Sequence, residues 1–135
     1  MKTILVVDDE VVLLKLLGSV LKKQYSVIEA VTAEQALRLF IDHGRHVDLL
    51  LADVTLPTSS GIQVARLLRS AIPRLPVILI SGYPVSAWSA RDSDDLDRLG
   101  SNSVAILEKP FQADALLNAV RELIGETQTE LAITA

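Results

Sequence analysis

The stretch Leu49-Leu50-Leu51-Ala52-Asp53 is an apolar run that ends in a carboxylate. Its residues do not alternate between apolar and polar, as they would in a strand with one face in water. Continuous apolar runs of this length are typical of parallel strands that helices cover on both faces. Two further runs of the same kind occupy residues 4–7 and 77–80. The sequence therefore predicts a parallel sheet whose central strands are fully buried.

Around these runs the sequence alternates between strand-like and helix-like segments. Strands are predicted over residues 4–7, 26–30, 47–52, 76–80 and 104–107. Helices are predicted over residues 10–23, 61–71, 86–99 and 112–124, and from a capping box at Thr32 to a stop at Gly44. This alternation predicts an α/β fold, with right-handed crossovers and helices on both faces of a five-stranded parallel sheet.

The apolar pattern defines the first of these helices better than the fourth. Residues 10–23 carry an apolar stripe that is expected to face the sheet, composed of Leu13, Leu16, Leu17, Val20 and Leu21. Residues 83–103 carry four aspartates and few apolar side chains. We expect a short or irregular helix in a long connection there, with residues 92–97 as a solvated face and Trp88 as a partly buried helix residue.

Length and composition restrict the possible classes of function. The 135 residues suit one domain over residues 1–125, followed by a tail over residues 126–135. The absence of cysteine excludes disulfides, thiol catalysis and cysteine-bound zinc. A net charge of −4 argues against a nucleic-acid-binding surface. No run approaches the ~18 apolar residues that span a bilayer, so we expect a soluble cytoplasmic protein without a membrane partner.

Polar residues follow the predicted strands at their carboxyl ends. They are Asp8 and Asp9 after the first strand, Asp53 after the third, Ser81 after the fourth and Lys109 after the fifth. In an open parallel sheet these ends lie along one edge, where ligands bind. Clustered carboxylates repel one another unless a cation joins them, and a set of oxygen ligands suits Mg²⁺. A carboxylate nucleophile, a divalent ion, a lysine and a hydroxyl are together suited to phosphoryl transfer.

Each of these residues also has an ordinary structural interpretation. Asp8 and Asp9 would suit a solvated helix start, because acids favour the first turn. Asp53 and Ser81 would suit turns, and Lys109 would suit the surface before a proline, which restricts the preceding residue to extended backbone. The functional interpretation depends on their joint placement at strand ends.

These motifs resemble those of the response regulator receiver domain of two-component signalling, and their wording is most similar to receivers attached to hybrid histidine kinases. The resemblance covers residues 2–125 in order. It consists of Ile-Leu-Val-Val-Asp8-Asp9-Glu10, Asp53-Val-Thr-Leu-Pro57 with Gly61, Ile-Ser81-Gly82-Tyr83, and Lys109-Pro110-Phe111.

The resemblance implies a flavodoxin-like doubly wound sheet of strand order 2-1-3-4-5. It implies Asp53 as the phosphoacceptor and Mg²⁺ as the cofactor, with Asp8, Asp9, Asp53 and the main-chain carbonyl of Thr55 as metal ligands, Asp8 through water. Ser81 and Lys109 would contact the phosphoryl oxygens. The Lys109–Pro110 peptide would be cis. The phosphoryl donor would be a phosphohistidine on a histidine kinase or a histidine phosphotransfer protein.

The sequence departs from the family at the position three residues before the lysine. Many receivers carry Tyr or Phe there, and the ring moves inward when the Ser or Thr hydroxyl moves toward the phosphoryl group. This chain has Ile106 instead. The segment between Ser81 and Lys109 is also longer than usual and contains Trp88, so we expect it to supply the moving part.

Three hypotheses follow. The leading one is a phosphoacceptor receiver that signals to an unknown downstream protein by contact and catalyses only its own phosphorylation and dephosphorylation. The second is a phosphorylation-independent interaction module on the same fold, which the missing aromatic residue favours. The third, an aspartate-nucleophile phosphohydrolase, needs an Asp-x-Asp pair after the first strand, and Asp8 and Asp9 are adjacent instead.

Overall fold

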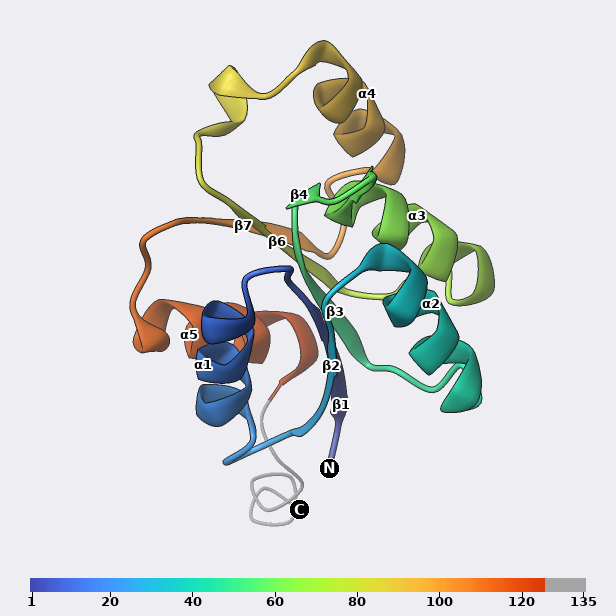
Figure 1. The fold of residues 1–135 in the computed structure, drawn as a ribbon, viewed down its shortest axis with the longest axis vertical. Coiled ribbons are helices and arrows are strands. Elements are labelled where there is room, and N and C mark those ends of the chain that lie inside the picture. The colour runs from blue at the N-terminus through green and yellow to red at the C-terminus, as the bar shows by residue number, and fades with distance from the viewer. Residues whose placement is uncertain (126–135) are drawn as a thin grey trace.

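The computed structural model describes residues 1–125, and the predicted tail over residues 126–135 lies outside the described residues. The core of the fold is a parallel sheet of five strands (Figure 1). Its strands are β1 (Thr3–Val7), β2 (Ser26–Ala30), β3 (Leu49–Asp53), β6 (Val77–Ser81) and β7 (Val104–Glu108). They lie in the order β2-β1-β3-β6-β7. Counted along the chain this is 2-1-3-4-5, so the predicted strand order is confirmed.

Helices cover both faces of this sheet, as predicted. They are α1 (Val11–Leu21), α2 (Ala33–Asp42), α3 (Gly61–Ala71), α4 (Ala90–Leu99) and α5 (Ala113–Ile124). Figure 1 shows α1 and α5 together on one side and α2 and α3 on the other. None of the helices in the described residues is long and apolar enough to cross a membrane.

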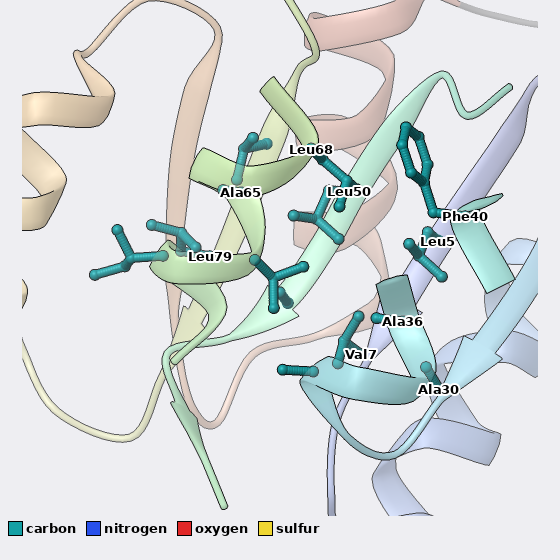
Figure 2. Close-up of a cluster of buried hydrophobic side chains, with 14 of the residues drawn as sticks. Leu5, Val7, Ala30, Ala36, Phe40, Leu50, Ala65, Leu68 and Leu79 are labelled. Atoms are coloured by element: carbon teal, nitrogen blue, oxygen red, sulfur yellow. The ribbon is translucent and has the colours of Figure 1, made fainter. Parts of the chain in front are cut away.

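The central strand β3 is buried along its whole length because its side chains alternate between two hydrophobic clusters. Leu49 and Leu51 pack on the side of α1 and α5. Leu50 and Ala52 pack on the side of α2 and α3, in the cluster drawn in Figure 2. A strand that supplies both clusters has no polar face, which is the physical reason for the continuous apolar run in the sequence.

The apolar stripe predicted for α1 is partly wrong. Leu17 and Leu21 are buried, but they are joined by Leu14 and Gly18, while Leu16 is 60% exposed. Residues four apart on a helix share a face, so the buried face is centred one position away from the predicted stripe. Leu16 is consequently an exposed apolar side chain on the α1 surface.

The segment between β6 and β7 also differs from its prediction. A short 3-10 helix, η1 (Val85–Ala87), comes first, and α4 begins only at Ala90, after Ser89 accepts a hydrogen bond from the backbone N–H of Asp92. Trp88 therefore lies between two helices, half-buried, and not within a helix.

The expectation of a solvated face over residues 92–97 is wrong for Asp95. Its side chain is buried and accepts hydrogen bonds from the Gln63 amide at 2.6 Å and the Arg66 guanidinium at 3.1 Å. Both partners lie on α3, and the residue pattern of the α4 segment alone contains no information about contacts with another helix. A buried carboxylate with two side-chain donors links α4 to α3.

A two-stranded hairpin that the sequence analysis did not predict follows β3. It consists of β4 (Thr55–Leu56) and β5 (Ser59–Ser60) and leads directly into α3. Gly61 opens α3 where the chain returns to β3, and its amide donates to the Val54 carbonyl. A Cβ atom at Gly61 would lie 2.3 Å from the main-chain oxygen of Asp53. Only glycine allows this approach.

We predict that Gly61→Ala lowers the free energy of unfolding by about 1–3 kcal/mol, a cost typical of inserting a methyl group into a packed site. The loss should occur even though alanine is the better helix former. Urea denaturation of the variant and wild type measures it. Gly82→Ala is the matched control, because no atom lies within 4 Å of the added Cβ there. Equal stability of the two variants would contradict the close-approach argument.

Candidate functional site

Strand ends bring together residues that are far apart in the sequence. Asp53 is the last residue of β3, Asp8 follows β1, and Lys109 follows β7. The Lys109 ammonium lies 2.7 Å from one carboxylate oxygen of Asp53 and 3.8 Å from one of Asp8. The Lys109–Pro110 peptide is cis, as the resemblance implied. The structure thus places three of the predicted site residues in direct or near contact at the carboxyl edge of the sheet.

The two carboxylate oxygens of Asp53 have different partners. Oδ1 accepts a hydrogen bond from the backbone N–H of Thr55 at 2.9 Å, and Oδ2 accepts one from Lys109 at 2.7 Å. The residue is 5% exposed, so little water competes for these positions. Hydrogen bonds to an ionised group are the strong ones, and two of them fix the orientation of this carboxylate.

Asp8 is completely buried and only half satisfied. Its Oδ1 accepts a hydrogen bond from the backbone N–H of Glu10 at 2.8 Å. Its Oδ2 has no hydrogen-bond partner among the described residues. Burial, opposed by the Glu10 hydrogen bond and reinforced by the nearby Asp53 charge, raises the pKa of Asp8 to about 6. An unsatisfied buried carboxylate oxygen beside a second carboxylate is a position that a cation would complete.

The ligand set suits a hard divalent cation. Carboxylate oxygens of Asp8, Glu10 and Asp53 lie within 4.8 Å of one another. Carboxylate oxygens are the ligands that Mg²⁺ prefers, usually with several waters retained. The residues therefore fit the predicted metal.

Glu10 is a site residue that the sequence analysis did not assign. It stands directly after the Asp8-Asp9 pair, and its carboxylate lies 3.3 Å from the Lys109 ammonium. The sequence signal that could have identified Glu10 is its place at the end of the motif Ile-Leu-Val-Val-Asp8-Asp9-Glu10. Asp9, in contrast, is exposed and is not a member of the three-carboxylate group. The assignments of Asp9 and of the Thr55 carbonyl as metal ligands stay predictions.

Lys109 is the cation that joins the three acids. Its ammonium contacts Asp53, Glu10 and Asp8, and its side chain is 21% exposed. Burial disfavours its charged form, but the hydrogen bond and charge of Asp53, the charge of Asp8 and the hydrogen bond to Glu10 together outweigh burial and raise the pKa of Lys109. The lysine is therefore held positively charged beside the Asp53 carboxylate.

Ser81, the last residue of β6, is buried, and its hydroxyl is engaged within its own loop. It donates to the Tyr83 carbonyl at 2.7 Å and accepts from the Tyr83 backbone N–H and the Trp88 indole N–H, both at 3.1 Å. To contact a phosphoryl oxygen, as the resemblance implies, the Ser81 hydroxyl would have to give up its hydrogen bond to the Tyr83 carbonyl. The sequence places Trp88 in the segment that is expected to move, but it does not predict the hydrogen bond between the Trp88 indole and the Ser81 hydroxyl.

The raised pKa of Asp8 predicts how stability depends on pH in the metal-free protein. Because the folded-state pKa of about 6 exceeds the ordinary aspartate value of 3.8, the folded protein binds the proton more tightly, and the free energy of unfolding falls as pH rises between these values. Asp8→Asn should remove this loss and raise the free energy of unfolding at pH 7.5 by on the order of 2 kcal/mol. Denaturant titrations in EDTA between pH 4.5 and 7.5 measure the effect.

The gain from Asp8→Asn should shrink as the pH is lowered below 6, where Asp8 is protonated in the folded state. Asp94→Asn, an exposed carboxylate on α4, is the control and should show no such dependence. A constant difference between Asp8→Asn and wild type across this range would contradict the assignment.

Comparisons with known proteins agree with this geometry. The model of the response regulator receiver domain family matches residues 4–121. The response regulator GtcR of Aneurinibacillus migulanus is 36% identical over 111 residues, which are 82% of this chain and 42% of that protein. The sensor kinase CckA of Brucella abortus is 29% identical over 90% of this chain and 12% of its own length. The chain thus spans less than half the length of either relative.

The solved structures that resemble this chain include response regulator receiver domains. A response regulator receiver protein from Sinorhizobium medicae matches with a TM-score of 0.76 and 30% identity, over 91% of this chain and 94% of that one. A CheY-like receiver domain protein from Methanospirillum hungatei matches with a TM-score of 0.77 and 26% identity, over 96% and 98%. Because the family model spans most of the chain and the strand order and carboxylate edge agree with it, the chain belongs to the response regulator receiver domain family of two-component signalling.

Proposed function

We propose that this receiver domain accepts a phosphoryl group from a phosphohistidine onto Asp53 and signals by protein contact. The observation that carries the proposal is the Asp53 carboxylate itself. It is nearly buried, fixed by the Thr55 amide on one oxygen and paired with the Lys109 ammonium on the other. An oriented carboxylate at the edge of a sheet, with a cation in contact, is suited to attack on phosphorus.

In the proposed step an Asp53 oxygen forms a bond to phosphorus while the phosphorus–nitrogen bond of the donor breaks. The electron pair of that bond goes to the imidazole nitrogen, and the ring takes a proton from water and leaves as neutral imidazole. Charge builds on the phosphoryl oxygens and on the departing nitrogen, and the Lys109 ammonium lies within hydrogen-bond distance of the attacking carboxylate. The reaction needs no oxidant and no second substrate.

The cation proposed for this site is Mg²⁺, which Asp8, Glu10 and Asp53 would hold. When bound, it supplies positive charge to the carboxylates and to the phosphoryl oxygens. The chain's own residues supply the rest. Lys109 balances charge at Asp53, the Thr55 amide orients the Asp53 carboxylate, and Asp8 would offer the cation its Oδ2, which accepts no hydrogen bond from the described residues. We propose no catalysis beyond the phosphorylation and dephosphorylation of Asp53.

The donor would be a histidine kinase or a histidine phosphotransfer protein, and an apolar groove beside the site offers it a docking surface. The groove lies between α1 and the start of α5, has a volume of about 340 Å³, and is lined by Leu13, Leu16, Val20, Phe111 and Leu116 among others. Lys109 and Pro110 also line it. Because Lys109 contacts Asp53 as well, a helix seated in the groove would hold its histidine next to the phosphoacceptor.

We predict that Asp53 is the single site of phosphorylation. Incubation with acetyl phosphate and Mg²⁺ should add one phosphoryl mass to wild type and none to Asp53→Asn, since the amide is not a nucleophile. Intact-mass spectrometry measures the product. Asp94→Asn, which removes an exposed carboxylate on α4, should react like wild type, and EDTA should suppress the reaction.

Two results would contradict this assignment. Modification of Asp53→Asn at the wild-type yield would place the acceptor elsewhere. Failure of wild type to be modified by acetyl phosphate or by any phosphohistidine donor would favour the phosphorylation-independent interaction module.

We predict that Leu16→Asp slows phosphoryl transfer from a phosphorylated histidine phosphotransfer protein by about tenfold or more, because an interfacial charge left unpaired is costly. Transfer from acetyl phosphate, which needs no docking, should be unchanged. Radiolabel transfer in single-turnover reactions measures both rates. Leu67→Asp is the matched control, since Leu67 is similarly exposed but lies on α3, across the sheet. Equal losses for the two donors would place the defect in the site rather than in docking.

A further inference from the structure

The Ser81 hydroxyl has no free hydrogen-bonding capacity in this structure. A serine hydroxyl has one proton to donate and two lone pairs to accept with. The proton goes to the Tyr83 carbonyl at 2.7 Å, and the lone pairs accept from the Tyr83 N–H and the Trp88 indole N–H at 3.1 Å each. For Ser81 to contact a phosphoryl group on Asp53, its proton must leave the Tyr83 carbonyl.

Trp88, further along the same loop, contacts both the Ser81 hydroxyl and the Tyr83 carbonyl. Its indole N–H donates to the Ser81 hydroxyl oxygen and also lies 3.3 Å from the Tyr83 carbonyl, so the same donor contacts the hydroxyl and the carbonyl to which that hydroxyl donates. Its ring packs against the hydrophobic cluster on the side of α2 and α3. The tryptophan is therefore held by packing and directs a polar group at Ser81.

Trp88 also sits at the entrance to α4. The next residue, Ser89, is the N-cap of that helix and accepts from the Asp92 backbone N–H at 3.1 Å. Helix α4 is in turn linked to α3 through the buried Asp95. A movement of Trp88 would be passed directly to the first turn of α4, because only the N-cap residue separates them.

Ile106, at the position where many family members carry an aromatic residue, cannot hydrogen-bond to the Ser81 hydroxyl. Ile106 is partly buried on the edge strand β7, beside Leu79 of β6. An aliphatic side chain has neither a hydrogen-bond donor nor an acceptor. Among the described residues, the aromatic group that contacts Ser81 comes from the connection between η1 and α4.

We infer that Trp88 is a positioning residue for Ser81: its indole N–H holds the serine hydroxyl in the resting arrangement and is released when Ser81 turns to a phosphoryl group on Asp53. This inference rests on the proposed function. In the released state the Ser81 proton donates to a phosphoryl oxygen, and the Tyr83 carbonyl remains available to the indole. The ring of Trp88 thereby reports the state of Asp53 to α4.

The inference has a thermodynamic consequence. A hydrogen bond made only in the resting state stabilises that state, so its removal shifts the population toward the state that binds a phosphoryl group. One typical hydrogen bond corresponds to roughly two- to tenfold in an equilibrium constant. Trp88→Phe keeps an aromatic ring and removes the N–H. It should therefore bind beryllofluoride, a phosphoryl mimic, about two- to tenfold more tightly in the presence of Mg²⁺.

Fluorine NMR titration of bound beryllofluoride measures this affinity without tryptophan emission. Tyr83→Phe is the matched control, since it removes a polar atom from a ring in the same loop but leaves the three Ser81 hydrogen bonds, which involve only the backbone of Tyr83 and the indole of Trp88. It should bind with wild-type affinity. Unchanged or weaker binding by Trp88→Phe would overturn the inference.

A second measurement uses the wild-type chain, whose single tryptophan is Trp88. Beryllofluoride with Mg²⁺ should change its emission, and Ser81→Ala should abolish the change. Binding without any change in wild-type emission would overturn the inference but leave phosphorylation of Asp53 standing. Absence of both beryllofluoride binding and acetyl phosphate modification in wild type would overturn the proposed function together with the inference.

Discussion

The ion pair between Lys109 and Asp53 is the interaction on which the site depends. Two buried carboxylates, Asp8 and Asp53, share one edge of the sheet with Glu10, and like charges about 4 Å apart repel by roughly 4 kcal/mol at an effective dielectric near 20. One ammonium in contact with the group offsets part of this repulsion. Burial, reinforced by the neighbouring Asp53 charge, raises the pKa of Asp8, and its Oδ2 has no hydrogen-bond partner among the described residues. The site thus carries an excess of negative charge that a divalent cation would neutralise.

The sheet makes this concentration of charge possible. Parallel strands place all their carboxyl ends at one edge, and the apolar runs before Asp8 and Asp53 anchor each acid to a buried strand. Close packing then sets the fine positions. Gly61 lies so near the Asp53 carbonyl that a methyl group would not fit, so the start of α3 and the end of β3 are positioned against each other.

The loop after β6 contains the contacts on which we base the inferred signalling route, in a chain that has no aromatic residue at position 106. Ser81 lies at the site edge, and its hydroxyl is hydrogen-bonded to a tryptophan that immediately precedes the cap of α4. Helix α4 is linked to α3 through a buried aspartate. A polar connection of this kind has few apolar contacts of its own, which makes it a suitable place for a two-state rearrangement.

The amino-acid sequence by itself determined the fold class, the strand order implied by the resemblance, and the places of Asp8, Asp53, Ser81 and Lys109 at strand ends. The fold class and these strand-end positions follow from local patterns, because a run of apolar residues that ends in a polar one has the same meaning in any parallel sheet, whereas the strand order came from the family resemblance alone. Only the tertiary structure decided which face of α1 is buried, that Asp95 is buried between α3 and α4, and that Glu10 belongs to the three-carboxylate group while the exposed Asp9 does not. The hydrogen bond between Trp88 and Ser81 is another feature that only the tertiary structure decided. Each of these depends on the direction of a side chain relative to a neighbouring element, and the periodicity of one segment carries no information about its neighbour.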